Sequence, residues 1–291
     1  MRISDILQER QTIFSCEIFP PKIGGELEHA FDIADKTAAL KPAFISVTCG
    51  AGGNTAAFTG QLAQHIEKSG VPSLAHITCV ATQKDEIFSI LDDYADKGIK
   101  NILALRGDLP KGEPAQTAQQ PASGRFRYAN ELVAAIKEHG GFCIGAACYP
   151  EGHLESSSQD EDITFLRQKV NAGCDFLTTQ MFFDNNVLYK FLYKLSQKEI
   201  NVPVLAGIMP VTNKAQIRRI VELSGTALPP RFLNILDKFG GNPAAMHQAG
   251  IAYATEQIID LIANNVRGIH LYTMNKPDIA QGIIHNLSEI L

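Results

Sequence analysis

The sequence has no long apolar run and no concentration of basic residues. No apolar stretch approaches the roughly 20 residues of a membrane-spanning helix, and residues 1–10 are polar and charged, without the apolar core of a signal peptide. The formal net charge of −5 is spread along the chain and leaves no basic stripe for nucleic acid or anionic lipid. We therefore expect a cytoplasmic protein without membrane or nucleic-acid partners, although one lysine or arginine can still hold a small anionic substrate.

Cysteine is scarce, and the six cysteines form no recognisable pattern. Most lie in apolar, strand-like runs, and they show neither CxxC spacing nor a nearby pair of histidines. Zinc sites and dithiol redox motifs need such spacing. We expect reduced cysteines in the core and no metal site.

The chain of 291 residues, 45% hydrophobic and 20% charged, suits one α/β barrel or two ordinary domains. A short apolar run rich in β-branched residues, a polar loop and a stretch of helical periodicity recur along it. The strand candidates are residues 12–19, 44–49, 74–79, 101–108, 143–150, 176–183, 203–210 and 268–275.

Eight such units predict a closed (β/α)8 barrel, the TIM-barrel fold of the α/β class. Extra helices are expected at 230–239 and 243–265, between strands seven and eight, and a long loop at 110–127. The doubly wound alternative is weaker because no GxGxxG follows the first strand. No linker marks a second domain, so we expect one domain over residues 1–291. Glycines that end predicted helices just before a strand are Gly70, Gly98, Gly140, Gly173 and Gly225.

The first strand carries an acidic residue near its carboxyl end, where barrel enzymes build their active sites. Alternation places Ile13, Ser15, Glu17 and Phe19 on one face of this strand. A buried carboxylate is costly unless it is paired, protonated or functional. A structural ion pair and a catalytic role for Glu17 both remain open on this ground.

The other strand ends carry polar residues that each have an ordinary explanation beside a functional one. His76 is compatible with a hydrogen-bonded core histidine, and Arg106 and Asp108 with a local ion pair or helix cap. Gln180 can satisfy backbone groups or bind the polar edge of a heterocycle. Since there is no Ser/His/Asp triad and no lysine inside a strand, the set favours a bound organic cofactor over hydrolysis or Schiff-base catalysis.

Eight short segments, one at each strand end, resemble the methylenetetrahydrofolate reductases in order and nearly end to end. They are residues 17–21, 46–51, 76–79, 104–110, 149–153, 179–184, 207–210 and 272–275. The resemblance implies non-covalent FAD at the barrel mouth, NADH or NADPH as co-substrate, and ping-pong reduction of 5,10-methylenetetrahydrofolate to 5-methyltetrahydrofolate. It also implies a place in one-carbon metabolism and methionine biosynthesis, and we expect a homo-oligomer.

The resemblance assigns roles to individual positions of this sequence. Glu17 resembles the general acid, which protonates N10 of the folate as the five-membered ring opens. Asp108, Gln180, Gln216 and Lys276 resemble substrate contacts. The positions that resemble FAD contacts are Thr48, His76, Arg106, Gly107, Asp108, Tyr128, Ala129, Tyr149, His153, Asp162 and Lys169. Lys169 is expected near the start of the helix after strand five, within reach of the pyrophosphate.

Four positions depart from the family's pattern. Ile220 replaces an aromatic residue that covers nicotinamide or folate, and Lys276 replaces an arginine for the glutamate tail. Gln168 replaces an arginine that assists FAD, and Phe165 a polar FAD neighbour. These departures concern fine contacts rather than the reaction. Three alternatives stay open: another barrel flavoenzyme such as proline dehydrogenase, a pterin-binding methyltransferase barrel without flavin, and an inactive barrel that senses folate or flavin.

Overall fold

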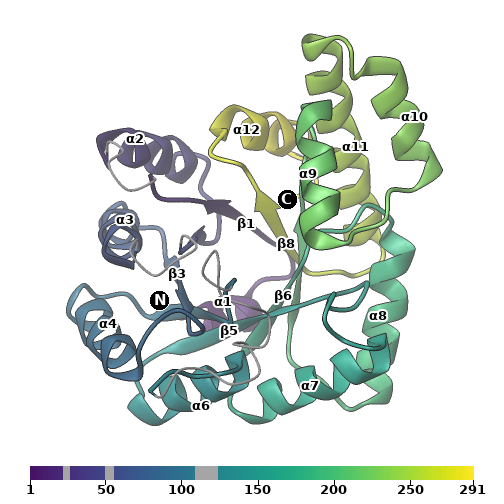
Figure 1. Ribbon diagram of the computed structural model, residues 1–291. Coiled ribbons are helices and arrows are strands. Elements are labelled where there is room, and N and C mark those ends of the chain that lie inside the picture. The colour runs from purple at the N-terminus through teal and green to yellow at the C-terminus, as the bar shows by residue number, and fades with distance from the viewer. Residues whose placement is uncertain (22–26, 50–55, 109–123) are drawn as a thin grey trace.

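The computed structural model describes residues 1–21, 27–49, 56–108 and 124–291. Parallel strands lie at the centre and helices surround them (Figure 1). The strands are β1 (Ile13–Ile18), β2 (Ile45–Val47), β3 (Ser73–Thr78), β4 (Asn101–Leu105), β5 (Cys143–Cys148), β6 (Phe176–Thr179), β7 (Val204–Ile208) and β8 (Gly268–Tyr272). Each pairs with the next and β8 pairs with β1, so the sheet closes. The predicted (β/α)8 barrel is confirmed.

Helices follow the strands and cover the outside of the barrel. They are α2 (Leu27–Ala38), α3 (Ala56–Lys68), α4 (Lys84–Asp96), α6 (Ala129–His139), α7 (Gln159–Asn171), α8 (Asn185–Gln197), α9 (Lys214–Ser224), α10 (Pro230–Phe239), α11 (Pro243–Ala263) and α12 (Pro277–Asn286). The expected extra helices are α10 and α11, which lie with α9 at one side of the ring in Figure 1. No helix in the described ranges is long and apolar enough to cross a bilayer.

Local sequence signals explain where several helices end and which face they bury. Gly140 and Gly225 end α6 and α9 with φ of +83° and +67°, a conformation that residues with a Cβ rarely adopt. The other three glycines predicted to end helices also have positive φ. Helix α2 buries Ala30, Ile33 and Thr37, which share one face at helical spacing.

The barrel interior is apolar at the amino ends of the strands. Short helix α1 (Ile3–Glu9) packs there against an apolar layer that includes Ile13, Phe44 and Phe176. The side chain of Asn101 attaches this helix to the barrel. Its Oδ1 accepts from the backbone N–H of Ile3 at 2.8 Å, and its Nδ2 donates to the carbonyls of Met1 and Ser73. This end of the barrel is therefore closed by an apolar floor.

Five of the six cysteines are buried, namely Cys16, Cys79, Cys143, Cys148 and Cys174. Burial raises the pKa of the Cys16 thiol to about 12. For these five, the prediction of core cysteines is confirmed. Cys49 is half-buried at the carboxyl end of β2.

Candidate active site

The carboxylate of Glu17 lies between two histidines at the carboxyl end of β1. Its Oε2 is 3.6 Å from Nε2 of His76 on β3 and 3.5 Å from Nε2 of His270 on β8. Both imidazoles are buried, whereas the Glu17 side chain remains 18% exposed. Alternation along the strands aims these three side chains into the barrel, directly above the apolar floor. The acid is therefore reachable from the carboxyl ends of the strands.

A serine hydroxyl contacts each of the two histidines. Oγ of Ser46 is 2.6 Å from Nε2 of His76. Burial lowers the pKa of His76 to about 4, which outweighs the opposite effect of Glu17. At pH 7 His76 is therefore neutral, and its contact with Glu17 is not an ion pair.

Ser15 contacts the second imidazole, that of His270. Oγ of Ser15 donates to the carbonyl of Ile269 at 3.2 Å and is 2.8 Å from Nδ1 of His270. Nε2, on the other side of the ring, faces Glu17. Our reading of the sequence missed His270, although its position two residues before Tyr272 in an alternating strand placed it inside the barrel.

The loop after β4 contains three predicted cofactor residues. Arg106 forms a bidentate ion pair with Glu155, with both N–O distances at 2.6 Å. Gly107 has φ +80°, and a Cβ there would collide with the side chain of Thr78. Asp108 is exposed and is the last residue described before the gap at 109–123. Most of the predicted loop at 110–127 lies outside the described residues.

Tyr149 and His153, two predicted cofactor residues, form an aromatic pair after β5. Their rings meet edge to face with centroids 4.7 Å apart. Burial is the main cause that lowers the pKa of His153, and the nearby Arg106 adds to it. Asp162, on α7, is buried, and this burial raises the pKa of its carboxyl.

Lys169 is not near the start of its helix, as the sequence had led us to expect. It lies in the last turn of α7, and its Nζ donates to the carbonyl of Ala147 on β5 at 2.8 Å. Burial lowers its pKa, while Asp162 acts in the opposite direction. The predicted start was wrong because α7 begins earlier, where Ser158 caps it by accepting from the backbone N–H of Glu161.

The remaining predicted cofactor residues lie at two further element ends. Thr48 follows β2, and its carbonyl accepts from the hydroxyl of Thr59 at 2.9 Å. Tyr128 and Ala129 are the N-cap and first residue of α6, where the Tyr128 ring is 42% exposed. The guanidinium of Arg127 lies 4.7 Å from the centroid of that ring.

Besides Asp108, the predicted substrate residues come from three separate elements. Gln180 follows β6, where its backbone N–H donates to the carbonyl of Cys148 at 2.7 Å. Gln216 lies in the first turn of α9, and Lys276 is the N-cap of α12. Asn213 caps α9, because its side chain accepts from the backbone N–H of Ala215.

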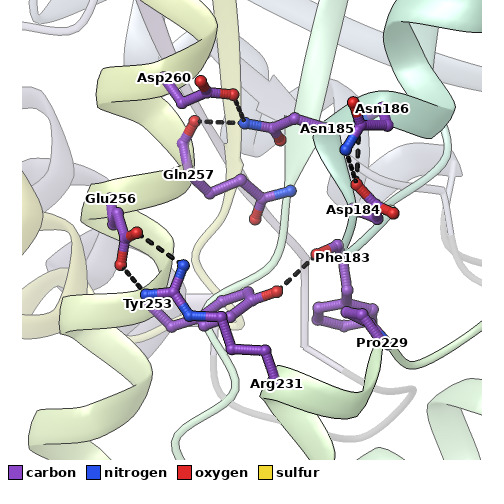
Figure 2. A pocket seen from close by; sticks show the side chains of 10 residues that line it. All are labelled: Phe183, Asp184, Asn185, Asn186, Pro229, Arg231, Tyr253, Glu256, Gln257 and Asp260. Carbon is purple, nitrogen blue, oxygen red and sulfur yellow. Dashed lines mark hydrogen bonds and ion pairs between the residues drawn. The ribbon is translucent and has the colours of Figure 1, made fainter.

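A cavity of about 360 Å³ lies elsewhere, among α8, α10 and α11 (Figure 2). Its polar groups largely satisfy one another. Arg231 pairs with Glu256, the Asn185 amide donates to Asp260, and the Tyr253 hydroxyl donates to the carbonyl of Phe183. None of the predicted site residues lines this cavity. We interpret it as a junction of three helices rather than as part of the site.

The structure thus defines a (β/α)8-barrel protein with an acid–base cluster inside the barrel mouth. No group of three or more His, Cys, Asp or Glu in the described part of the chain could hold a metal ion. The family model described as "Methylenetetrahydrofolate reductase" matches residues 2–288. The chain belongs to the methylenetetrahydrofolate reductase family.

Two curated relatives illustrate how the chain compares with that family. It is 34% identical to "Methylenetetrahydrofolate reductase (NADH) 1" of Arabidopsis thaliana over 99% of this chain, but spans only 50% of that protein. It is 32% identical to "5,10-methylenetetrahydrofolate reductase" of Escherichia coli (strain K12), over 94% of this chain and 90% of that one. The chain therefore spans about half of the plant relative and most of the bacterial one.

A solved structure shares the fold at low sequence identity. It is an uncharacterized protein from Clostridium thermocellum that binds two copies of 5-methyl-5,6,7,8-tetrahydrofolic acid, by its own description. The TM-score is 0.62 at 13% identity, and the match covers 99% of this chain and 100% of the other. At this identity the likeness concerns the fold alone.

Proposed function

We propose that this protein reduces 5,10-methylenetetrahydrofolate to 5-methyltetrahydrofolate with non-covalent FAD and NADH or NADPH, and that Glu17 is its general acid. Family membership supports the reaction. The observation that carries the catalytic assignment is the Glu17 carboxylate, held between His76 and His270 at the open end of the barrel.

The proposed role of Glu17 follows from what the folate requires. Its five-membered ring opens only when N10 receives a proton, and a positioned carboxylic acid can supply one. Both imidazoles contact Oε2 of the carboxyl group, and we propose that its other oxygen, Oε1, carries the proton to N10. Neutral His76 adds a polar contact without a competing positive charge. The two serines hold the imidazoles and thereby limit where the carboxyl group can turn.

The donor set at the rim fits FAD. A pyrophosphate needs cations, and Arg106 and Lys169 lie on the same side of the mouth as the aromatic pair formed by Tyr149 and His153. The Nε–H of Arg127 is buried and has no hydrogen-bond partner among the described residues. An unpaired buried donor is costly, and a bound dinucleotide would relieve that cost. When bound, FAD supplies the hydride chemistry between nicotinamide and folate.

Four residues are proposed to hold the substrate. Gln180 and Gln216 have amide groups that can both donate to and accept from the pterin ring. Asp108 is proposed to contact the pterin and the flavin edge, and Lys276 the anionic glutamate tail. Thr48, Gly107, Tyr128, Ala129 and Asp162 complete the proposed FAD site.

The visible spectrum of the purified protein tests this function. We expect oxidised flavin that NADH or NADPH bleaches, that 5,10-methylenetetrahydrofolate reoxidises, and that acid precipitation releases into the supernatant. Absence of flavin would favour the methyltransferase alternative, and flavin that no nicotinamide reduces would favour a sensor. Bleaching by proline instead would favour proline dehydrogenase.

A further inference from the structure

Glu155 holds the guanidinium of Arg106 across two loops of the barrel mouth. Its Oε2 accepts from Nη1 and its Oε1 from Nη2, both at 2.6 Å. The arginine side chain is 23% exposed and the glutamate 59%. Bidentate pairs of this kind fix the plane of the guanidinium as well as its position. Arg106 follows β4 and Glu155 follows β5, so the pair also ties together two neighbouring loops.

The backbones of Arg106 and Glu155 are also fixed by hydrogen bonds. The carbonyl of Arg106 accepts from the backbone N–H groups of Cys79 and Val80. The N–H of Glu155 donates to Nδ1 of His153 at 3.1 Å. A nitrogen that accepts is unprotonated, so in neutral His153 the proton lies on Nε2. Glu155 therefore contacts two residues proposed to bind FAD, one through its side chain and one through its backbone.

The bidentate contact leaves part of the guanidinium free for a ligand. Arginine has five N–H donors, and Glu155 uses one hydrogen on each Nη. The Nε–H and the second hydrogen on each Nη remain for other acceptors. The carboxylate thus holds the group without using all of its donors.

We propose that Glu155 is a positioning residue for FAD binding, because it holds Arg106 in the orientation that meets the dinucleotide. This inference rests on the proposed function. The direction in which FAD affinity changes when the Glu155 carboxylate is removed distinguishes this role from simple charge repulsion. FAD is anionic, so a carboxylate near its site that did nothing else would repel it, and removal of that carboxylate would tighten binding.

The test is the FAD dissociation constant of the apoprotein, measured by calorimetry. We expect Glu155→Gln to weaken FAD binding roughly 2- to 5-fold, the range for a partly exposed pair. Glu155→Asp keeps a carboxylate on a shorter side chain, so it should weaken FAD binding less than Glu155→Gln does. Asp160→Asn is the matched control, since it removes an exposed carboxylate that pairs with Lys194 rather than with Arg106, and it should change binding less than about two-fold.

A double-mutant cycle shows whether the effect passes through Arg106. Lysine cannot form the bidentate contact, so Glu155→Gln should change FAD binding less than about two-fold in an Arg106→Lys background. Unchanged or tighter binding by Glu155→Gln alone would overturn this inference, as would an equal loss in the Arg106→Lys background. If the wild-type apoprotein does not bind FAD, the proposed function fails together with the inference.

Discussion

A glutamine at position 17 would keep the size of the side chain and its hydrogen-bonding capacity but could not supply a proton. We expect Glu17→Gln to fold, to bind FAD and to be reduced by NADH within a few-fold of the wild-type rate. Reoxidation by 5,10-methylenetetrahydrofolate should fall on the order of 10²- to 10⁴-fold. Stopped-flow measurement of the two half-reactions separates these effects. A wild-type rate with folate would leave Glu17 only a structural role.

Burial of His76 should make the protein less stable in mild acid. The folded state holds the His76 pKa near 4, against about 6.5 when unfolded, so below pH 6.5 the unfolded chain binds a proton that the folded chain does not. Stability is therefore lost as the pH falls from 6.5 towards 4, and His76 accounts for about 2 kcal/mol of that loss by pH 5.

Urea denaturation at several pH values between 7.5 and 5 checks this expectation. The free energy of unfolding of His76→Gln should fall less steeply with pH than that of the wild type. His29→Gln, at an exposed position, should follow the wild-type slope. Equal slopes for His76→Gln and wild type would show that His76 takes up its proton in the folded state.

Sequence reasoning located Glu17 and His76 but could not bring them together with His270. The acid and His270 are 253 residues apart, and only the pairing of β1 with β8 makes them neighbours. Ser15 and His270 are register partners in that pairing. A local pattern cannot give such a contact because it depends on closure of the sheet. Tyr149 and His153 lie in one loop, so their proximity does not depend on closure of the sheet and is easier to predict from the sequence.

Among the elements, helix α1 is hydrogen-bonded to the barrel through the side chain of Asn101. Asn101→Ala would leave the backbone N–H of Ile3 and the carbonyl of Ser73 without these partners in a buried place. We expect a loss of roughly 2–4 kcal/mol in the free energy of unfolding, measured with urea. Asn234→Ala, at an exposed position on α10, should cost less than about 0.5 kcal/mol. A wild-type midpoint for Asn101→Ala would show that α1 is held by its apolar contacts alone.

Element boundaries were less predictable than the elements themselves. The strand candidates at 101–108 and 143–150 extend past the ends of β4 and β5, which placed Arg106 and Tyr149 inside strands. In fact both lie in the loops, where their side chains can turn towards the mouth. Apolar periodicity records burial, and residues just beyond a strand can be buried as well.

At the scale of the molecule, the described residues leave the barrel mouth as the route by which a ligand reaches Glu17. The apolar floor and α1 close the other end, so the proposed substrates, nicotinamide and folate, would both arrive from the mouth. We expect the two substrates to exclude each other, with high folate inhibiting competitively against NADH. Steady-state rates over a grid of both concentrations check this. Lines that intersect on a double-reciprocal plot, with no inhibition by folate, would indicate that the enzyme binds nicotinamide and folate at the same time.

The apolar floor also supports the site above it at one point. Ile13, Phe44 and Phe176 belong to one apolar cluster with α1, and the Phe44 ring also stacks on His270, with ring centroids 5.9 Å apart. A protein engineer could therefore vary Ile13 and Phe176 to raise heat resistance, whereas a change at Phe44 would also disturb the histidine beside Glu17. Tolerance to substitution should accordingly be lower at Phe44 than at the other two positions.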